Sequence, residues 1–395
     1  MTAASYDLIV VGAGIHGAGV AQAAAARGHS VLVLEKTAPG SGTSSRSSKL
    51  IHGGLRYLET GQFGLVRECL RERTLLLRLA PDLVKRIPFY IPVYPGAKRG
   101  PATLRLGLTL YALLAGLGPD ARFARLSRRS WDTLDGLETR RLRAVFRYYD
   151  AQTDDVALTR AVLASAESLG AELICPGRLV HGRVREDGVD VEYALGAATH
   201  TVRAHALVNA AGAWANGVLE RFVPAQAQLQ VQMVQGTHII VPGNLTQGVY
   251  YLPAPSDQRP VFVMPWKGNV MVGTTEHVYH GDPIHVTPRP NERTYLLEVL
   301  SYYFPLYRSE STARISDAFA GLRILPMGNG TLGHRPRETT LHVDREHKPR
   351  LLTLYGGKLT AYRATAQSVM ARLAESLPSR SEKARTDALP LAPVD

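Results

Sequence analysis

The first 35 residues of the chain carry the pattern that most constrains its fold. Residues 6–11 form a strand-length, mainly apolar run, and Gly12, Gly14 and Gly17 follow it with GxGxxG spacing. An Ala-rich stretch over residues 18–26 predicts a helix, and residues 30–35 form a second strand-length run that ends at Glu35. This order of strand, glycine turn, helix and strand predicts a Rossmann-like α/β domain with a parallel sheet.

The glycine turn and Glu35 together indicate a bound dinucleotide. The first glycine allows the tight turn, the second lets the backbone approach a pyrophosphate, and the third permits close packing of helix and strand. The N-terminus of the helix supplies positive potential for the phosphates. Glu35 follows Gly17 by 18 residues, where a carboxylate accepts hydrogen bonds from both ribose hydroxyls and repels a 2′-phosphate. The pattern disfavours NADP and does not distinguish FAD from NAD.

Composition excludes several classes of protein. The chain has 395 residues, of which 45% are hydrophobic and 20% charged, so disorder, collagen and coiled coil are excluded. At about 150 residues a domain, we expect two or three domains. Cys69 and Cys175 are too few for a disulfide-dense secreted fold or a cysteine-based zinc site, so we expect a reducing compartment and no metal. The net charge of +12 suits nucleic acid, a membrane surface or an acidic substrate.

No segment has the pattern of a signal peptide or a transmembrane helix. The N-terminus lacks a basic region, and its apolar run leads directly into the glycine turn. The best candidate span, residues 106–119, has 14 residues without a charge, whereas a bilayer needs about 20. A longer uncharged run, residues 222–256, is interrupted by Gln, Pro and Gly. We therefore expect a cytoplasmic protein.

The rest of the chain predicts further strands and helices. Residues 65–79 have apolar side chains at helical spacing, and residues 206–212 form another buried strand that ends in glycine. Between residues 231 and 275, β-rich pieces alternate with Pro and Gly, which predicts an antiparallel sheet. Residues 351–355 predict a last strand and residues 360–377 a last helix. The polar, Pro-rich residues 381–395 are expected to form a loose tail.

Two long motifs resemble those of a known family. Residues 43–58 read TSSRSSKLIHGGLRYL, and residues 356–363 read GGKLTAYR. Their small residues let the backbone approach a flat ring system, and Ser and Lys side chains can reach phosphate and flavin oxygens. With shorter matches at residues 236–238, 265–266, 273–275, 321–323 and 337–338, residues 6–377 resemble the FAD-dependent (respiratory) glycerol-3-phosphate dehydrogenases. These enzymes have the D-amino-acid-oxidase-like flavoprotein fold.

The chain departs from that family in a few places. Family members usually have three consecutive glycines where this chain has Gly12, Ala13 and Gly14. They usually carry an Asp where Ala23 stands, and a Ser, Thr or Gly where Ala361 stands. These changes are small, so we expect flavin binding to persist. Family members commonly carry a further helical C-terminal domain, and this sequence stops near the point where that domain would begin.

The resemblance implies an α/β fold in which a discontinuous Rossmann-like FAD-binding domain carries an inserted antiparallel-sheet substrate domain. The FAD-binding domain is expected to comprise residues 1–80, 150–222 and 310–380. The substrate, or cap, domain is expected to comprise residues 81–149 and 223–309.

The resemblance also implies the residues of the active site. FAD is expected to be held without a covalent bond. The residues expected to bind FAD are Gly12, Gly14, Ile15, His16, Gly17, Glu35, Lys36, Thr43, Ser44, Ser45, Ser48, Lys49, Leu50, His52, Gly53, Val180, Ala211, Gly212, Trp214, Gly357, Lys358, Leu359 and Thr360. The residues expected to bind the substrate are Arg56, Tyr57, Thr237, His238, Arg323, Arg337 and Lys358.

Catalytic roles are implied for Arg56, His238 and Arg323. Arg337 and Lys358 are expected to bind the substrate phosphate, and arginine suits phosphate because its fork is bidentate and permanently charged. His238 is expected to act as the general base, since the ordinary pKa of imidazole is close to neutrality. Arg323 is expected to bind the C2 oxygen and lower the pKa of that hydroxyl. Either His238 or a water held by Arg323 takes the proton.

The implied reaction is oxidation of sn-glycerol 3-phosphate to dihydroxyacetone phosphate, with hydride passing from C2 to flavin N5 and electrons to a quinone. The alternatives of the same fold are an oxygen-using glycerol-3-phosphate oxidase and an FAD-dependent 2-hydroxy acid dehydrogenase. A nucleic-acid-modifying flavoprotein is disfavoured, because no stacking aromatics interleave with the basic stretch. A non-catalytic flavoprotein is a further alternative. No nucleic acid is expected as a partner.

The basic stretch over residues 98–147 predicts contact with an anionic membrane surface. It contains 11 Lys or Arg against 4 Asp or Glu. Within it, the uncharged residues 106–119 are flanked by arginines, as interfacial segments are. A quinone dissolves in lipid, so we expect the protein to lie peripherally on the inner face of the cell membrane. The flanking residues are Arg105, Arg122, Arg125, Arg128 and Arg129.

Overall fold

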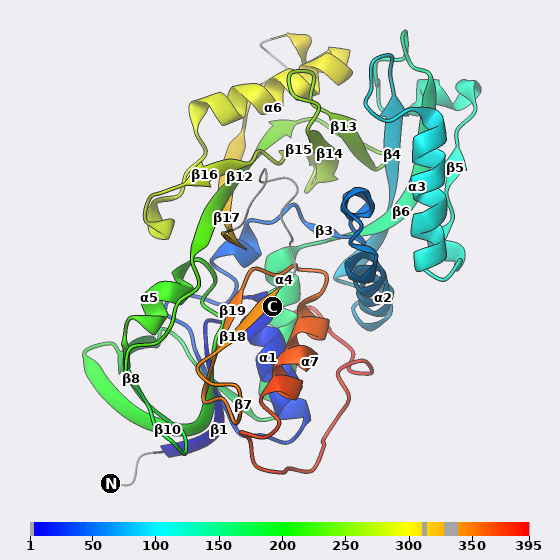
Figure 1. The fold of residues 1–395 in the computed structure, drawn as a ribbon. Helices are drawn as coiled ribbons and strands as arrows, with labels where there is room; N and C mark the ends of the chain where they lie inside the picture. Colours follow the sequence, from blue (N-terminus) through cyan, green and yellow to red (C-terminus); the bar gives the residue numbers. More distant parts are fainter. Residues whose placement is uncertain (1–3, 310–313, 328–338, 395) are drawn as a thin grey trace.

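The described part of the chain, residues 4–309, 314–327 and 339–394, folds around two β-sheets of nine and ten strands. In this computed structural model the two sheets lie one above the other, and the lower one in Figure 1 contains the N-terminal βαβ unit. One sheet has a parallel centre and the other is mainly antiparallel. The α/β class expected from the sequence is confirmed.

The nine-stranded sheet is parallel at its centre. β1 (Ala4–Val11) pairs with β2 (Val31–Leu34) and β10 (Ala198–Asn209), β2 pairs with β7 (Ala171–Ile174), and β10 pairs with β19 (Leu351–Tyr355). The apolar runs of β2 and β19 are buried throughout, as expected for strands covered on both faces. The carboxyl ends of these strands therefore form one edge, where α/β sheets bind their ligands. The outer strands are β8 (Arg178–Val184), β9 (Val189–Leu195), β11 (Phe222–Val223) and β18 (Thr340–Val343).

Three helices pack together on this sheet. They are α1 (Ile15–Ala26), α4 (Asp155–Ser168) and α7 (Tyr362–Arg372). α1 lies between the other two and is buried along nearly its whole length, which its Ala and Gly residues permit because they leave room for close approach. At Gly19 of α1, a Cβ atom would lie 2.7 Å from the ring of Tyr362.

The ten-stranded sheet forms the other layer. Its main order is β16-β12-β15-β14-β13-β4-β6-β3, with β17 beside β12 and β5 beside β6. α6 (Pro290–Tyr303) crosses its outer side in Figure 1 and buries Leu296 and Leu300 in an apolar core with residues of this sheet, Tyr250 and Val263 among them. The strands are β3 (Leu50–Ile51), β4 (Val84–Val93), β5 (Ala124–Arg125), β6 (Ala144–Thr153), β12 (Val231–Pro242), β13 (Val249–Pro253), β14 (Pro260–Trp266), β15 (Asn269–Gly273), β16 (His277–Tyr279) and β17 (Asp317–Pro326).

The remaining helices connect the two layers or lie on their surface. They are α2 (Phe63–Leu79), α3 (Pro101–Leu114) and α5 (Ala215–Leu219). The uncharged residues 106–119 fall on α3 and the turn after it. Among the described residues, no helix combines the length and the apolar composition that crossing a membrane requires. Short 3₁₀ helices cover Thr43–Ser45, Leu55–Thr60, Pro119–Ala121, Arg128–Thr133, Gly212–Trp214, Pro283–His285 and Pro305–Arg308.

Two strands pair differently from what the expected domain boundaries imply. β3 lies within residues 1–80 but pairs with β6, and β17 lies within residues 310–380 but pairs with β12 over ten residues. Both strands therefore belong to the ten-stranded sheet. The division of the chain into domains stays a prediction.

The expectation of a loose tail over residues 381–395 is wrong for its described part. The backbone N–H groups of Lys383 and Ala384 both donate to the carbonyl oxygen of Ala26, at the C-terminus of α1. Leu391 is 4% exposed, and its N–H donates to the carbonyl oxygen of Leu79. The last carbonyls of a helix lack partners within the helix, so a polar segment can be ordered by pairing with them.

Candidate active site

The turn between β1 and α1 has the conformation that a dinucleotide requires. Gly12 has a φ of +100°, a region that favours glycine. At Gly17, a Cβ atom would lie 1.8 Å from the carbonyl oxygen of Gly12, so a larger residue does not fit. The N–H of Ile15, the first residue of α1, donates to Ser44 Oγ at 2.9 Å. Residues expected to bind FAD from two separate motifs thus meet at the N-terminus of α1.

Glu35 follows β2 directly and has both carboxylate oxygens fixed. Oε2 accepts the N–H of Ala13 at 2.8 Å, and Oε1 accepts the N–H of Thr37 at 2.8 Å. A carboxylate oxygen has a second lone pair, so Glu35 can still accept ribose hydroxyls. The next residue, Lys36, places its Nζ 4.0 Å from the ring centroid of Trp214, which brings together two further residues expected to bind FAD.

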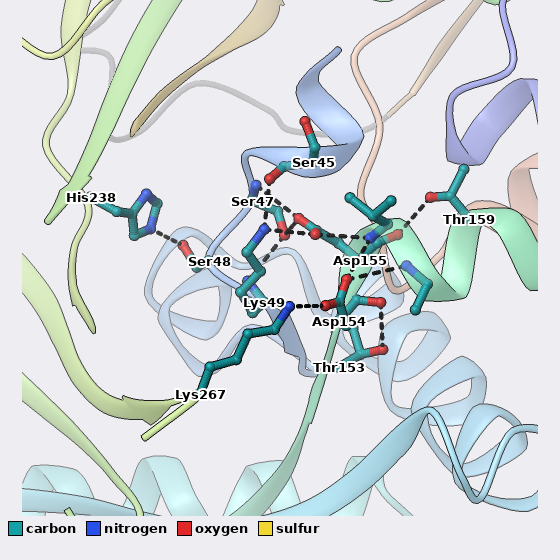
Figure 2. Close-up of polar contacts among 12 residues, drawn as sticks. Ser45, Ser47, Ser48, Lys49, Thr153, Asp154, Asp155, Thr159, His238 and Lys267 are labelled. Carbon is teal, nitrogen blue, oxygen red and sulfur yellow. Dashed lines mark hydrogen bonds and ion pairs between the residues drawn. The ribbon is translucent and has the colours of Figure 1, made fainter. Parts of the chain in front are cut away.

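A buried ion pair anchors residues 45–49 to helix α4 (Figure 2). Lys49 Nζ lies 2.7 Å from Asp155 Oδ1 and 2.6 Å from the carbonyl oxygen of Ser45. Asp155 Oδ2 accepts the N–H of Ser47 at 3.1 Å and its hydroxyl at 2.7 Å. Asp155 is 0% exposed and Lys49 5%, so separating the pair would leave an uncompensated buried charge. This network holds Lys49 at a φ of +59°, a conformation that non-glycine residues rarely adopt.

His238 faces this loop from strand β12, as Figure 2 shows. Its Nε2 lies 2.9 Å from Ser48 Oγ. The imidazole stacks on the ring of Phe319 in β17, with centroids 4.9 Å apart and planes inclined by 16°. On β15, a Cβ atom at Gly273 would lie 2.1 Å from His238 Cδ2, so the absence of a side chain there admits the ring. The other nitrogen, Nδ1, is buried and has no hydrogen-bond partner among the described residues.

The surroundings of His238 keep it neutral. Burial lowers the pKa of His238 to about 3, and the positive charges of Lys49 and Arg323 act in the same direction. The imidazole is therefore uncharged at neutral pH and has a lone pair to accept a proton. This is the state that a general base needs.

Arg323 lies on β17, opposite Val234 of β12. Its Nη2 is 3.4 Å from Glu276 Oε1, and Arg259 Nη2 is 3.5 Å from the other oxygen of the same carboxylate. The Arg323 side chain is 31% exposed. Because Val234 and His238 are four residues apart on β12, Arg323 lies on the side of the sheet that carries His238.

The segment after β19 brings the second long motif against the first. The hydroxyl of Thr360 accepts the N–H of His52 at 3.1 Å. Lys358 Nζ lies 3.6 Å from the ring centroid of Tyr57 and has no hydrogen-bond partner among the described residues. An ammonium has three N–H donors, so this group is suited to an anionic ligand.

His16 lies between the glycine turn and the second motif. A Cβ atom at Gly357, whose φ is +110°, would lie 2.1 Å from His16 Nε2. Burial lowers the pKa of His16 to about 4, so this imidazole is neutral as well. His16 and Gly357, which we expected to bind FAD, are therefore in direct contact.

The other residues expected at the site lie on several separate elements. Arg56 is on the 3₁₀ helix Leu55–Thr60, Leu50 is in β3, Val180 is in β8, and Leu359 follows Lys358. Thr43 donates its hydroxyl to the carbonyl oxygen of Leu322. Gly53 donates its N–H to Tyr111, and Ala211 donates its N–H to Asn209 Oδ1 just before Gly212, whose φ is +55°. Arg337 lies outside the described residues.

Thr237 does not face the site. Neighbouring side chains of a strand point to opposite sides, so Thr237 points away from His238. Its hydroxyl donates to Glu292 Oε2 at 2.8 Å, and its N–H donates to Thr275 Oγ1 at 2.9 Å. Glu292 is 0% exposed and lies at the start of α6. Thr237 therefore fixes β12 against α6 from the side opposite His238.

The sequence interpretation missed the buried carboxylates that support the site. Asp155 orders residues 45–49, and Asp150 accepts the hydroxyl of Tyr111, which in turn accepts the N–H of Gly53. One signal was present for Asp155. Two consecutive aspartates, Asp154 and Asp155, stand at the start of α4, and an N-cap needs only one of them. Asp154 is the N-cap, so the second aspartate called for another role.

The model of the FAD dependent oxidoreductase family matches residues 7–363. The chain belongs to this family. It is an oxidoreductase that uses FAD, and the glycine turn and the accepting Glu35 carboxylate fit that cofactor. The assignment of individual residues to FAD stays a prediction.

Two similar proteins are named for polyol phosphates. Glycerol-3-phosphate dehydrogenase from Pseudomonas aeruginosa is 38% identical over 378 residues, covering 93% of this chain and 71% of that protein. D-erythritol 1-phosphate dehydrogenase from Brucella abortus is 36% identical over 384 residues, covering 94% and 74%. Among solved structures, the glycerol-3-phosphate dehydrogenase from Bacillus halodurans complexed with FAD has a TM-score of 0.73 at 25% identity, covering 98% of this chain and 68% of that one.

Proposed function

We propose that the protein oxidises sn-glycerol 3-phosphate to dihydroxyacetone phosphate with FAD and passes the electrons to a quinone. One observation carries the proposal. His238 is buried and neutral, has an unpartnered Nδ1, and lies within the influence of the cations Lys49 and Arg323. A neutral proton acceptor in positive surroundings suits an anionic alcohol.

In this reaction the side chains bind the substrate, orient it and remove one proton. His238 takes the proton of the C2 hydroxyl, and Arg323 stabilises the negative charge that develops on that oxygen. Lys358 and Arg337 bind the phosphate, because charge-assisted hydrogen bonds are the stronger kind. FAD, when bound, supplies the acceptor for the hydride that leaves C2.

D-erythritol 1-phosphate is a second candidate substrate. The Brucella abortus relative named for that substrate is 36% identical to this chain, within the range of 32–38% among the glycerol-3-phosphate dehydrogenases compared. Both compounds combine a phosphate with a secondary alcohol, so the proposed residues serve either. Measuring the turnover of glycerol 3-phosphate and of D-erythritol 1-phosphate decides between these two substrates, and glycolate and 2-hydroxyglutarate serve as controls. A quinone analogue and oxygen are compared as acceptors, and turnover with oxygen alone would favour an oxidase.

We also propose that FAD is bound without a covalent link. Cys69 is buried on α2, and burial raises the pKa of its thiol to about 11, which leaves it unreactive. Acid precipitation should release the flavin into the supernatant. Flavin that stays in the pellet contradicts this proposal.

We propose further that the outer side of α3 contacts an anionic membrane. Leu106, Leu113 and Leu117 are 72%, 54% and 66% exposed, and Leu104 and Leu108 hold the opposite side of the helix in the core. Exposed arginines lie nearby, and anionic lipid attracts each by about 1 kcal/mol. They are Arg105, Arg122, Arg125, Arg128 and Arg129. Binding here would bring the protein to the lipid that holds the quinone.

Sedimentation with vesicles tests this surface. The protein should bind phosphatidylserine-containing vesicles at low salt and be released at high salt. Replacing Leu106 and Leu113 by Ser should abolish binding, whereas Leu195→Ser, at an exposed position on β9, should not. Equal binding to neutral and anionic vesicles, or no binding at low salt, contradicts the proposal.

A further inference from the structure

The two nitrogens of His238 have different surroundings. Nε2 is in contact with Ser48 Oγ, whereas Nδ1 is buried without a hydrogen-bond partner among the described residues. A buried polar atom without a partner is rare, because it has lost its hydrogen bonds to water. Nδ1 is therefore the nitrogen whose capacity for a hydrogen bond is unused.

Neighbouring strands hold the ring in this orientation. Phe319 of β17 and Gly273 of β15 are the register partners of His238 on either side of β12. Phe319 stacks on the imidazole, and the Cδ2 and Nε2 edge lies against Gly273. A half-turn of the ring would place Cε1 where Nε2 lies and so remove the contact between Nε2 and Ser48 Oγ.

Ser48 is held in turn by the residues on both sides of it. Ser47 is bound through its N–H and its hydroxyl to Asp155, and Lys49 is bound through its ammonium to the same carboxylate. The backbone at positions 47 and 49 is thus tied to the first residues of α4. Figure 2 shows this arrangement, with Ser48 pointing away from Asp155 and towards His238.

We propose that Ser48, positioned by the Lys49–Asp155 pair, accepts the Nε2 hydrogen of His238 and thereby makes Nδ1 the atom that takes the substrate proton. Ser48 is a positioning residue in this arrangement, because it acts through His238. In the step, the O–H bond of the substrate alcohol breaks and an Nδ1–H bond forms, while the Nε2–H bond is retained. The Ser48 contact is compatible with both the neutral imidazole and the imidazolium, since Nε2 carries hydrogen before and after the transfer.

This inference rests on the proposed role of His238 as general base. Its first test needs no substrate, so it can fail independently of the proposed reaction. In ¹⁵N-histidine-labelled holoenzyme at neutral pH, the His238 signals, assigned by their loss in His238→Ala, should show a protonated Nε2 and an unprotonated Nδ1. A protonated Nδ1 in the wild type overturns the inference, whichever substrate the enzyme uses.

The second test measures the rate of flavin reduction in a stopped-flow instrument. Ser48→Ala should reduce the rate about tenfold, which is the effect of one lost neutral hydrogen bond. In this variant the neutral imidazole should populate both tautomers, with the hydrogen on Nδ1 or on Nε2. Ser48→Thr keeps the hydroxyl and should restore both readouts. Ser168→Ala, at the exposed C-terminal end of α4, is the matched control and should change neither. An unchanged tautomer in Ser48→Ala also overturns the inference.

Discussion

Replacing Asp150 by Asn should destabilise the protein strongly, because Asp150 is the only carboxylate that the described structure pairs with a buried arginine of α2. Arg73 Nη1 lies 2.5 Å from Asp150 Oδ1, and the two residues are 1% and 2% exposed. Removing one partner of a buried pair costs about 3–5 kcal/mol, since the remaining charge stays buried without compensation. Arg73 keeps its hydrogen bond to the carbonyl oxygen of Tyr149, so we expect the lower half of that range.

Urea unfolding followed by circular dichroism measures the free energy of unfolding for this variant. The matched control is Asp187→Asn, whose partner Arg203 is on the surface, with side chains 73% and 42% exposed. Exposed pairs contribute less than about 1 kcal/mol, so this variant should resemble the wild type. Equal free energies of unfolding for the two variants would show that the buried Arg73–Asp150 pair contributes no more than an exposed one.

A companion variant separates stability from cofactor binding. Tyr111 donates to both oxygens of Asp150 at 2.9 Å and accepts the N–H of Gly53 at 2.8 Å. Tyr111→Phe removes a hydrogen bond to a charged group, which contributes about 1.5–3 kcal/mol. Because Gly53 lies in the motif expected to hold FAD, the dissociation constant of FAD should rise as well. An unchanged dissociation constant means that this motif does not depend on Tyr111.

Three further predictions concern the glycine turn, the phosphate site and pH. Gly17→Ala should yield protein without FAD, since its Cβ would lie 1.8 Å from the Gly12 carbonyl oxygen, whereas Gly64→Ala, in open space, should purify with full FAD content. Lys358→Ala should raise the KM for glycerol 3-phosphate about tenfold to a hundredfold, with normal flavin content; an unchanged KM excludes a phosphate contact. Burial lowers the pKa of His238 from 6.5 to about 3, so between these pH values the imidazole is protonated in the unfolded chain and neutral in the folded one. The free energy of unfolding should therefore fall as the pH drops from 6.5 towards 3. His238→Gln should lessen that fall in urea titrations, and an identical fall contradicts the buried neutral state.

The sequence predicted the parts of the fold that depend on local patterns. The glycine turn, the strand that ends at Glu35 and the last strand, Leu351–Tyr355, lie where their periodicity and composition placed them. The short match at residues 236–238 identified His238, and the second long motif identified Lys358. Each has a buried nitrogen without a hydrogen-bond partner among the described residues. Thr237 was expected to bind the substrate together with His238, although alternation along a strand puts neighbouring side chains on opposite sides.

The supporting carboxylates could not be predicted, because their partners are far away in the sequence. Asp155 pairs with Lys49 and Asp150 pairs with Arg73, across 106 and 77 positions respectively. Such contacts depend on how strands and helices are packed, which periodicity does not reveal. The C-terminal segment illustrates the same limit, since its order arises from the carbonyl oxygens of Ala26 and Leu79 and not from its own composition.

We propose that this FAD-dependent oxidoreductase takes glycerol 3-phosphate as its substrate, and one absorbance experiment can decide whether it does. Purified holoenzyme is mixed anaerobically with glycerol 3-phosphate, and the visible absorbance of oxidised flavin is followed. The proposed function predicts rapid bleaching in wild-type enzyme and bleaching slowed about 10²–10⁴-fold in His238→Ala. Flavin that stays oxidised with glycerol 3-phosphate, while D-erythritol 1-phosphate or a 2-hydroxy acid bleaches it, would contradict the claim.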